Sequence, residues 1–389
     1  MKPDKKLLYV ISYHHACNDG TLMALVALLP ILVEEMDLSY SDIGLLGFGL
    51  IVTVVVQLFV GKVADRMFSS YLMEIGALLM GLSFALLLLV SDFTGLFIVV
   101  IVMRIGASFY HPVGISWITK EFGGSYLDTA LGIQSGIGNL GVIIALGTSG
   151  FLGELYGWKT PCLVWTFLNL LAVVMGVLVV RGRDLSIERI PKPAGTSSRQ
   201  TFAKMAALAL PIAAGGALYQ ITSYFGPLNL TTMHDWSAGN ADLMFAIWIG
   251  LGTLTSYYFG SLTARFGRQS ILRTGYAISA CAMVLLFLFS EWYLVLLVVV
   301  AFGSVLFLTY PALFAMVTEA TDDDERGTAF GILFGFQLGG GAIVVYLCGM
   351  LADLTGNPAV SFLVASALAA GSLVTVVYWE RLCSRSTGV

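Results

Sequence analysis

Long apolar runs, repeated along the whole chain, are the feature that most constrains its fold. A helix needs roughly 20 apolar residues to cross a hydrocarbon core about 30 Å thick, and these runs are long enough. Only 11% of the 389 residues are charged, whereas soluble domains carry roughly 25%. The sequence therefore predicts an all-α integral membrane protein with twelve transmembrane helices, at residues 7–33, 40–62, 71–90, 95–118, 128–153, 158–180, 203–229, 241–263, 270–290, 292–318, 327–352 and 358–380.

The positions of Lys and Arg predict the orientation of these spans. With twelve spans, nearly all loop cations fall on one side, and the opposite loops hold Lys159 alone. Because basic loops stay in the cytoplasm, we expect a multi-pass protein of the plasma (inner) membrane with both termini cytoplasmic. The first apolar run is too long for a signal peptide and lacks a small-residue cleavage site, so we interpret it as a retained span.

The two halves of the chain repeat each other. A shift of 199 residues pairs Gly61 with Gly260 and Pro112 with Pro311, and it also aligns 129–133 with 328–332 without a gap. Chance does not readily produce so many matched glycines and prolines at one offset. We predict an N-terminal six-helix bundle at 1–180, a polar cytoplasmic linker at 181–202, and a C-terminal six-helix bundle at 203–389.

One loop motif and this repeat resemble a known family. Gly61-x-x-x-Asp65-Arg66, between spans two and three, resembles the signature loop of the major facilitator superfamily, whose substrates bind between two six-span halves. The resemblance implies a conformational lock, in which Asp65 meets the start of span eleven and holds one of two alternating states. The alternative is ordinary loop charge on the cytoplasmic side. The expected lock residues are Gly61, Asp65, Arg66, Arg265, Arg268 and Arg326.

Three shorter motifs resemble one branch of that superfamily, the fosmidomycin-resistance proteins. They are Ser12-x-x-His15-x-x-Asn18-Asp19, Phe109-Tyr110-His111-Pro112 and Gly138-Asn139-Leu-Gly141. This resemblance implies a proton-driven exporter of small drugs or metabolites. The glycine-rich fifth span also resembles that of exporters, although their Gly-Pro pair is absent here and close helix packing alone is the preferred explanation of such glycines.

Two charges lie in the middle of predicted spans. Asp19 is about midway along span one and Arg104 about midway along span four, so both should lie at similar depth. A charge at this depth costs about 2.5 to 3.5 kcal/mol on the insertion scale, which makes it a functional candidate. We expect the two to interact and to couple protons or bind substrate. A purely structural buried pair is the alternative.

Histidines near these charges are candidate proton carriers. His15 lies one turn from Asp19, and His111 lies two turns from Arg104. Imidazole titrates near neutral pH, although a membrane histidine also serves as a hydrogen-bonded spacer. His14 is about 100° away around the helix and is a weaker candidate. We expect no metal site and no cofactor, because His14, His15 and Asp19 on one helix are too few ligands.

The second half carries no matching charge in its predicted spans. Glu74 and Arg273, which the same offset relates, are expected at the membrane interface. The first half would handle protons and an anionic group through Asn18, Asp19 and Arg104, and the second half would offer aromatic and hydrogen-bonding groups. Core packing is the alternative for these aromatic residues. The second-half candidates are Tyr219, Gln220, Tyr224, Asn229, Trp248, Tyr310 and Gln337.

These features together predict a proton-coupled antiporter that exports a small organic solute by alternating access. We expect a monomer in the lipid bilayer whose partners are the solute and protons, with no nucleic acid. An importer is the alternative within the same fold, and a non-transporting scaffold or sensor is a third possibility that the intramembrane charges argue against. No phosphate-binding loop, nucleophile elbow or metal-ligand cluster indicates an enzyme.

Overall fold

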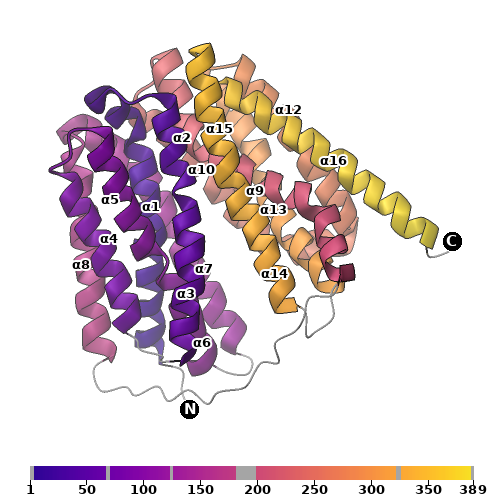
Figure 1. Cartoon of the computed structure of the whole chain (residues 1–389), viewed down its shortest axis with the longest axis horizontal. Helices are drawn as coiled ribbons and strands as arrows, with labels where there is room; N and C mark the ends of the chain where they lie inside the picture. The colour runs from indigo at the N-terminus through magenta and orange to yellow at the C-terminus, as the bar shows by residue number, and fades with distance from the viewer. Residues whose placement is uncertain (1–3, 67–70, 123–125, 181–198, 321–325, 387–389) are drawn as a thin grey trace. The chain divides into compact units, whose positions relative to one another are not determined.

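The computed structural model describes residues 4–66, 71–122, 126–180, 199–320 and 326–386 (Figure 1). Within these ranges the secondary structure is helical and contains no strand. The predicted all-α class is therefore confirmed.

The described helices account for the twelve predicted spans. Nine of the twelve spans are formed by described helical stretches that are long and apolar enough to cross a membrane. A further span, bent by 64°, is formed by α10 (Ala238–Tyr257) together with α11 (Phe259–Phe266). The remaining two predicted spans correspond to α4 (Tyr71–Leu87), a shorter apolar helix, and α9 (Arg199–His234).

The chain divides into two compact units, each of which takes a short segment from the other half of the sequence. The first unit comprises Met1–Leu38, Gly49–Ile190 and Trp236–Ala246. Its described helices are α1 (Lys5–Met36), α3 (Leu50–Arg66), α4, α5 (Phe93–Ala107), α6 (Tyr110–Glu121), α7 (Leu127–Tyr156), α8 (Lys159–Val180) and the beginning of α10.

The second unit comprises Ser39–Phe48, Pro191–Asp235 and Ile247–Val389. Its described helices are α2 (Tyr40–Phe48), α9, the rest of α10, α11, α12 (Arg268–Leu288), α13 (Trp292–Ala320), α14 (Arg326–Phe334), the π-helix η2 (Gly335–Gly339), α15 (Gly340–Thr355) and α16 (Val360–Ser386).

Spans four and eleven, among the interrupted spans, carry candidate site residues at their interruptions. In span four, α5 ends at Ala107 and α6 begins at Tyr110, two residues before Pro112. Proline lacks the N–H that would bond to the carbonyl four residues earlier, which favours it in the first turn of a helix, although its repeat partner Pro311 lies inside the continuous helix α13. Span eleven changes to π-helix over Gly335–Gly339, and such segments often occur at functional sites. Tyr110, His111 and Gln337 all lie at these interruptions.

Glycines bring α1 and α7 close together in the first unit. A Cβ atom on Gly138 would collide with the His15 imidazole, and one on Gly141 would collide with the backbone of Ala16. Gly132 and Gly136 of the same helix have nothing within 4 Å of that position. Helix packing thus explains two of the span-five glycines, and Gly138 also makes room for His15.

Candidate functional site

Asp19 lies at the centre of a cluster of titratable side chains in the first unit. Its carboxylate is 3.0 Å from His15 Nε2, one turn earlier on α1, and 3.4 Å from His111 Nε2 in the first turn of α6. Asn18 Nδ2 donates a hydrogen bond of 2.8 Å to Asp19 Oδ1. The structure therefore brings together Asn18 and three of the four predicted proton-coupling residues.

Gln134 and Tyr110 hold the imidazole of His15 in place. His15 Nδ1 lies 3.1 Å from the backbone oxygen of Gln134 and 2.6 Å from its side-chain amide, which also donates to the Tyr110 hydroxyl at 2.8 Å. The His15 and Tyr110 rings stack with centroids 4.7 Å apart and planes 17° from parallel. His15 is therefore oriented on both its edge and its face, with Nε2 directed at the carboxylate.

Exposure differs between the two histidines. The side chain of His15 is 10% exposed, that of Asp19 is 24% and that of His111 is 35%. Because charge interactions strengthen as water is excluded, the pair of Asp19 with His15 is the better shielded. His111 is the member of the cluster that water or a solute can reach most easily.

This arrangement can store protons. With both imidazoles neutral, the ionised cluster carries one negative charge, and successive protons bring it to zero and then to one positive charge. The nitrogen and oxygen atoms of His15, Asp19 and His111 lie within 4.8 Å of one another, a separation that would also admit a metal ion. The His–Asp distances are those of hydrogen-bonded ion pairs, so we interpret the cluster as a proton site.

The expected pairing of Asp19 with Arg104 is not the one found. Among the described residues, the ion pairs of the Asp19 carboxylate are with His15 and His111. Arg104 is buried in the last turn of α5, and its carbonyl oxygen accepts hydrogen bonds from Thr53 Oγ1 at 3.2 Å and Ser108 Oγ at 2.8 Å. A break in the helix at Ser108 and Phe109 separates Arg104 from His111, which sequence spacing alone does not show. A role for Arg104 in transport stays a prediction.

The second-half candidates form an aromatic group in the second unit. Tyr219 lies 5.4 Å from Trp248 and 6.2 Å from Phe307, and Phe307 lies 5.9 Å from Tyr310, measured between ring centroids. The Tyr310 hydroxyl donates to the Gly215 carbonyl at 3.1 Å.

The remaining second-half candidates lie outside the aromatic group. Gln337 lines a small cavity together with Tyr310. Gln220, Tyr224 and Asn229 are buried in α9. These residues are positioned to pack the unit, and their role in substrate binding stays a prediction.

The expected lock lies partly outside the described residues. Gly61 is in α3, Arg265 is in the last turn of α11 beside the Phe266 ring, and Arg268 begins α12. The side chains of Asp65, Arg66 and Arg326 are not among those that the structure describes. The lock therefore stays a prediction.

Two acidic residues of the predicted spans are buried in the structure. Asp242 is an ionisable side chain inside the predicted span 241–263 that the expectation of no matching charge passed over: it lies in α10 and is fully buried beside Gly150. Glu74 was expected at the membrane interface; that depth stays a prediction, and its side chain is buried within the protein, at 4% exposed. Among the described residues, neither carboxylate has a hydrogen-bond partner. Both residues lie near a predicted span end, where sequence alone does not separate a buried side chain from an interfacial one.

Comparison with known proteins identifies the family. The model of the Major Facilitator Superfamily matches residues 15–249 and 212–385, which cover most of the chain. The chain belongs to the Major Facilitator Superfamily. It is a multi-pass membrane transporter, as the apolar spans predicted. The proposed membership of the fosmidomycin-resistance branch stays a prediction.

Individual relatives of this Major Facilitator Superfamily transporter are distant. The uncharacterized MFS-type transporter YfnC of Bacillus subtilis (strain 168) is 23% identical over 90% of this chain and 87% of its own length. Multidrug resistance protein 1 of the same organism is 25% identical over 91% of each chain.

Solved structures share the fold of this Major Facilitator Superfamily transporter. The nucleoside transporter NupG has a TM-score of 0.76 at 16% identity, covering 97% of this chain and 99% of its own. The POT family transporter PepTSo has a TM-score of 0.80 at 12% identity, covering 98% and 99%. At these identities the likeness concerns the fold alone.

Proposed function

We propose that this transporter is a proton-coupled antiporter that exports a small organic solute across the plasma (inner) membrane. The observation that carries the proposal is the Asp19 cluster, in which one carboxylate and two imidazoles meet inside membrane-spanning helices. A charged group there is costly unless it is paired, so the cluster favours protonation states of low net charge. A change in its protonation can therefore alter what the site binds.

The coupling follows from competition between a proton and a solute. When the cluster is protonated, His15 and His111 can both pair with Asp19 and the charges largely cancel. Loss of protons leaves a net negative charge that attracts a cationic group or repels an anionic one. If one form favours each state of an alternating-access cycle, proton binding on one side drives solute release there. Arg104 would serve an anionic group of the solute, and the aromatic group of the second unit its apolar part.

The export direction is supported by one relative. Multidrug resistance protein 1, as its name says, concerns drug resistance, and it matches this chain almost end to end. We take the cytoplasmic orientation of both termini and the monomeric state as part of the same proposal. An importer of a small metabolite would use the same proton site with the opposite coupling, so the direction needs its own measurement.

Asp19→Asn tests the proposal. The variant keeps the shape of the side chain but cannot ionise, so both ion pairs become neutral hydrogen bonds at best. We expect pH-driven transport to fall by at least tenfold in proteoliposomes, while solute exchange without a pH gradient is retained. The solutes are ethidium and a panel of other small drugs, and protein folding is checked by size-exclusion chromatography. Coupled transport at the wild-type rate in folded Asp19→Asn protein would exclude Asp19 from the mechanism.

The same variant provides the control for direction in cells. Cells that express the wild type should accumulate less of a transported drug than cells that express Asp19→Asn. This difference should disappear when an uncoupler collapses the proton gradient. Glu35→Gln, a change of an exposed carboxylate in the last turn of α1, should behave as the wild type. Greater accumulation in wild-type cells would mean import.

A further inference from the structure

A second titratable pair lies behind the Asp19 cluster in the first unit. His14 of α1 is 2% exposed and Glu74 of α4 is 4% exposed. Both groups border Gly176 of α8: a Cβ atom there would collide with the Glu74 carboxylate and would lie 2.8 Å from His14 Nε2. The carboxylate and the imidazole are thus neighbours, and the absence of a side chain at position 176 provides their space.

In the part of the chain that the structure describes, each group keeps polar atoms without a partner, although the His14 ring also bonds to the backbone of Ala172. Among the described residues, His14 Nε2 and both carboxylate oxygens of Glu74 have no hydrogen-bond partner. A bare ionised carboxylate in such a setting is strongly disfavoured, and it takes up a proton unless a cation is bound. A proton bound by Glu74 removes its charge, and the neutral imidazole of His14 nearby is a second proton acceptor.

The neighbouring helices offer few competing charges. The helices packed against α4 are α1, α5, α6 and α8. Near this pair, α8 contributes the apolar residues around Ala172 and Gly176. The other titratable or charged side chains on the remaining three helices in this region are Tyr13, His15, Cys17 and Asp19 of α1, Arg104 of α5, and Tyr110 and His111 of α6.

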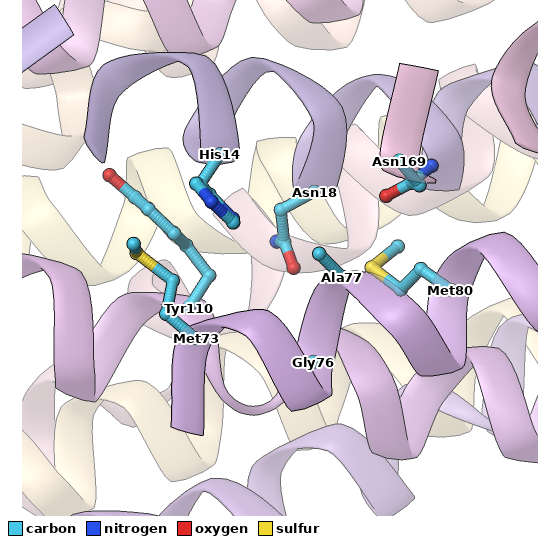
Figure 2. A pocket seen from close by; sticks show the side chains of 8 residues that line it. All are labelled: His14, Asn18, Met73, Gly76, Ala77, Met80, Tyr110 and Asn169. Atoms are coloured by element: carbon cyan, nitrogen blue, oxygen red, sulfur yellow. The ribbon is translucent and has the colours of Figure 1, made fainter. Parts of the chain in front are cut away.

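A small cavity lies beside His14, and it is also lined by Asn18 and Tyr110, which contact Asp19 and His15. Its volume is about 10 Å³, close to what one water molecule requires, and such a water needs two to four polar partners. Figure 2 shows His14 and Asn18 of α1 on one side of this cavity, opposite the α4 residues Met73, Ala77 and Met80. Tyr110 and Asn169 complete the polar lining.

The polar residues of the cavity belong to both sites. Asn18 donates to Asp19, and Tyr110 stacks on His15 and accepts from Gln134. Among the described residues, the oxygen of the Asn169 amide has no partner, although its nitrogen donates to Thr21 Oγ1 at 2.7 Å and to the Trp165 carbonyl at 2.8 Å. A water in this cavity would therefore find an unused acceptor.

We propose that His14 and Glu74 form a second proton-binding site, which exchanges protons with the Asp19 cluster through a water in this cavity. The proposal rests on the proposed function, since the relay would supply the proton that Asp19 uses. Transfer moves one proton and no electrons: the water accepts a proton from the His14–Glu74 pair and releases one toward the Asp19 carboxylate, and the reverse step restores both sites. Glu74 lies in the first turn of α4, at the end that we predict to be cytoplasmic.

Direct counting of protons tests this second site without any solute. Purified protein in weakly buffered detergent is mixed with acid in a stopped-flow instrument, and the dye pyranine reports proton uptake between about pH 9 and pH 5.5. Exposed carboxylates stay ionised in this window, because an unperturbed Glu titrates near about pH 4.3. Glu74→Gln should lower the uptake by up to one proton per molecule, and it should slow the uptake by the Asp19 cluster at least tenfold. Glu35→Gln should change neither.

A second measurement protects the test against misfolding. Infrared difference spectra of the wild type should contain a protonated-carboxyl band that Glu74→Gln removes and that Glu74→Asp retains at a shifted position. His14→Gln should leave the band but slow the uptake. A folded Glu74→Gln protein with wild-type proton count, rate and spectrum would overturn the proposal.

The outcomes for the two sites are distinguishable. If Asp19→Asn abolishes coupled transport and Glu74→Gln changes nothing, the antiport mechanism stands and the relay is wrong. Suppose instead that Glu74→Gln lowers the proton count and removes the protonated-carboxyl band, while Asp19→Asn still couples transport at the wild-type rate. The second site then exists but does not feed Asp19. Both the relay and the proposed role of Asp19 are then overturned.

Discussion

At the scale of single residues, the two histidines beside Asp19 differ in what surrounds them. His15 is nearly buried, lies 3.0 Å from the carboxylate and also contacts Gln134 and Tyr110. His111 is 35% exposed and lies 3.4 Å away. Breaking a buried pair leaves an uncompensated charge, whereas a more exposed pair contributes little because water screens it.

We therefore predict unequal effects of removing each imidazole. His15→Gln should lower the free energy of unfolding by about 3 kcal/mol or more, whereas His111→Gln should lower it by less than about 1 kcal/mol. Equilibrium unfolding in mixed micelles, followed by tryptophan fluorescence, measures both. Thr148→Ala is a matched control, because this exposed hydroxyl bonds only within its own helix, to the Ile144 carbonyl. Equal losses for the two histidine variants would contradict the assignment of His15 as the shielded partner.

The sequence predicted the charged centre of the site but not the residues that support it. Asp19 and His15 could be predicted because each is a costly group in the middle of an apolar run. Gln134 is a single amide in a glycine-rich span, and only the approach of α1 shows that it orients His15. The burial of Glu74 could not be predicted because it depends on Gly176, about 100 residues later in the chain. Partners supplied by distant helices leave no local pattern.

At the scale of helices, the positions of the spans could be predicted from the sequence, but the breaks within the spans could not. Hydropathy located the spans because a bilayer requires long apolar helices with internal hydrogen bonds. The break between α5 and α6 follows from Pro112, but a proline in a membrane helix produces either a kink or a break, according to the neighbouring helices. His111 follows this break, and in the described part of the chain the ion pairs of Asp19 are with His15 and His111.

The contact of α1 with α7 provides a prediction at this scale. Gly141→Ala should be strongly destabilising, by about 1 to 3 kcal/mol or more, because its Cβ would meet the rigid backbone of Ala16. Gly138→Ala should displace the His15 imidazole and reduce proton coupling as well. Gly136→Ala has open space and should be neutral or slightly stabilising, since alanine favours the helix.

Thermal unfolding in detergent and pH-driven transport check these three variants. Gly136 is the matched control, because it lies on the same helix as Gly138 and Gly141 but has open space at its Cβ position. Loss of stability in Gly136→Ala as large as that in Gly141→Ala would show that the glycines serve helix flexibility and not close packing.

At the scale of the whole molecule, the internal repeat extends to two carboxylates that cap helices. In the second unit, Asp353 of α15 accepts hydrogen bonds of 2.8 Å from the backbone N–H groups of Tyr40 and Ser41, at the start of α2. In the first unit, Glu154 of α7 accepts from those of Ala238 and Gly239, at the start of α10. The offset of 199 residues relates Glu154 to Asp353 and Tyr40 to Gly239. Each half of the sequence therefore caps a helix of the other half.

Because a carboxylate at a helix N-terminus satisfies free N–H groups and opposes the helix dipole, both caps should be stabilising. Glu154→Gln and Asp353→Asn should each cost about 0.5 to 2 kcal/mol. The two caps share no partner and lie in different units, so the double variant should cost the sum of the single losses to within about 0.5 kcal/mol. Equilibrium unfolding in mixed micelles measures all three variants, with Glu35→Gln as the control. If the double variant is as stable as either single variant, the two caps are not independent. Loss of either cap would then already remove the stabilisation that both provide.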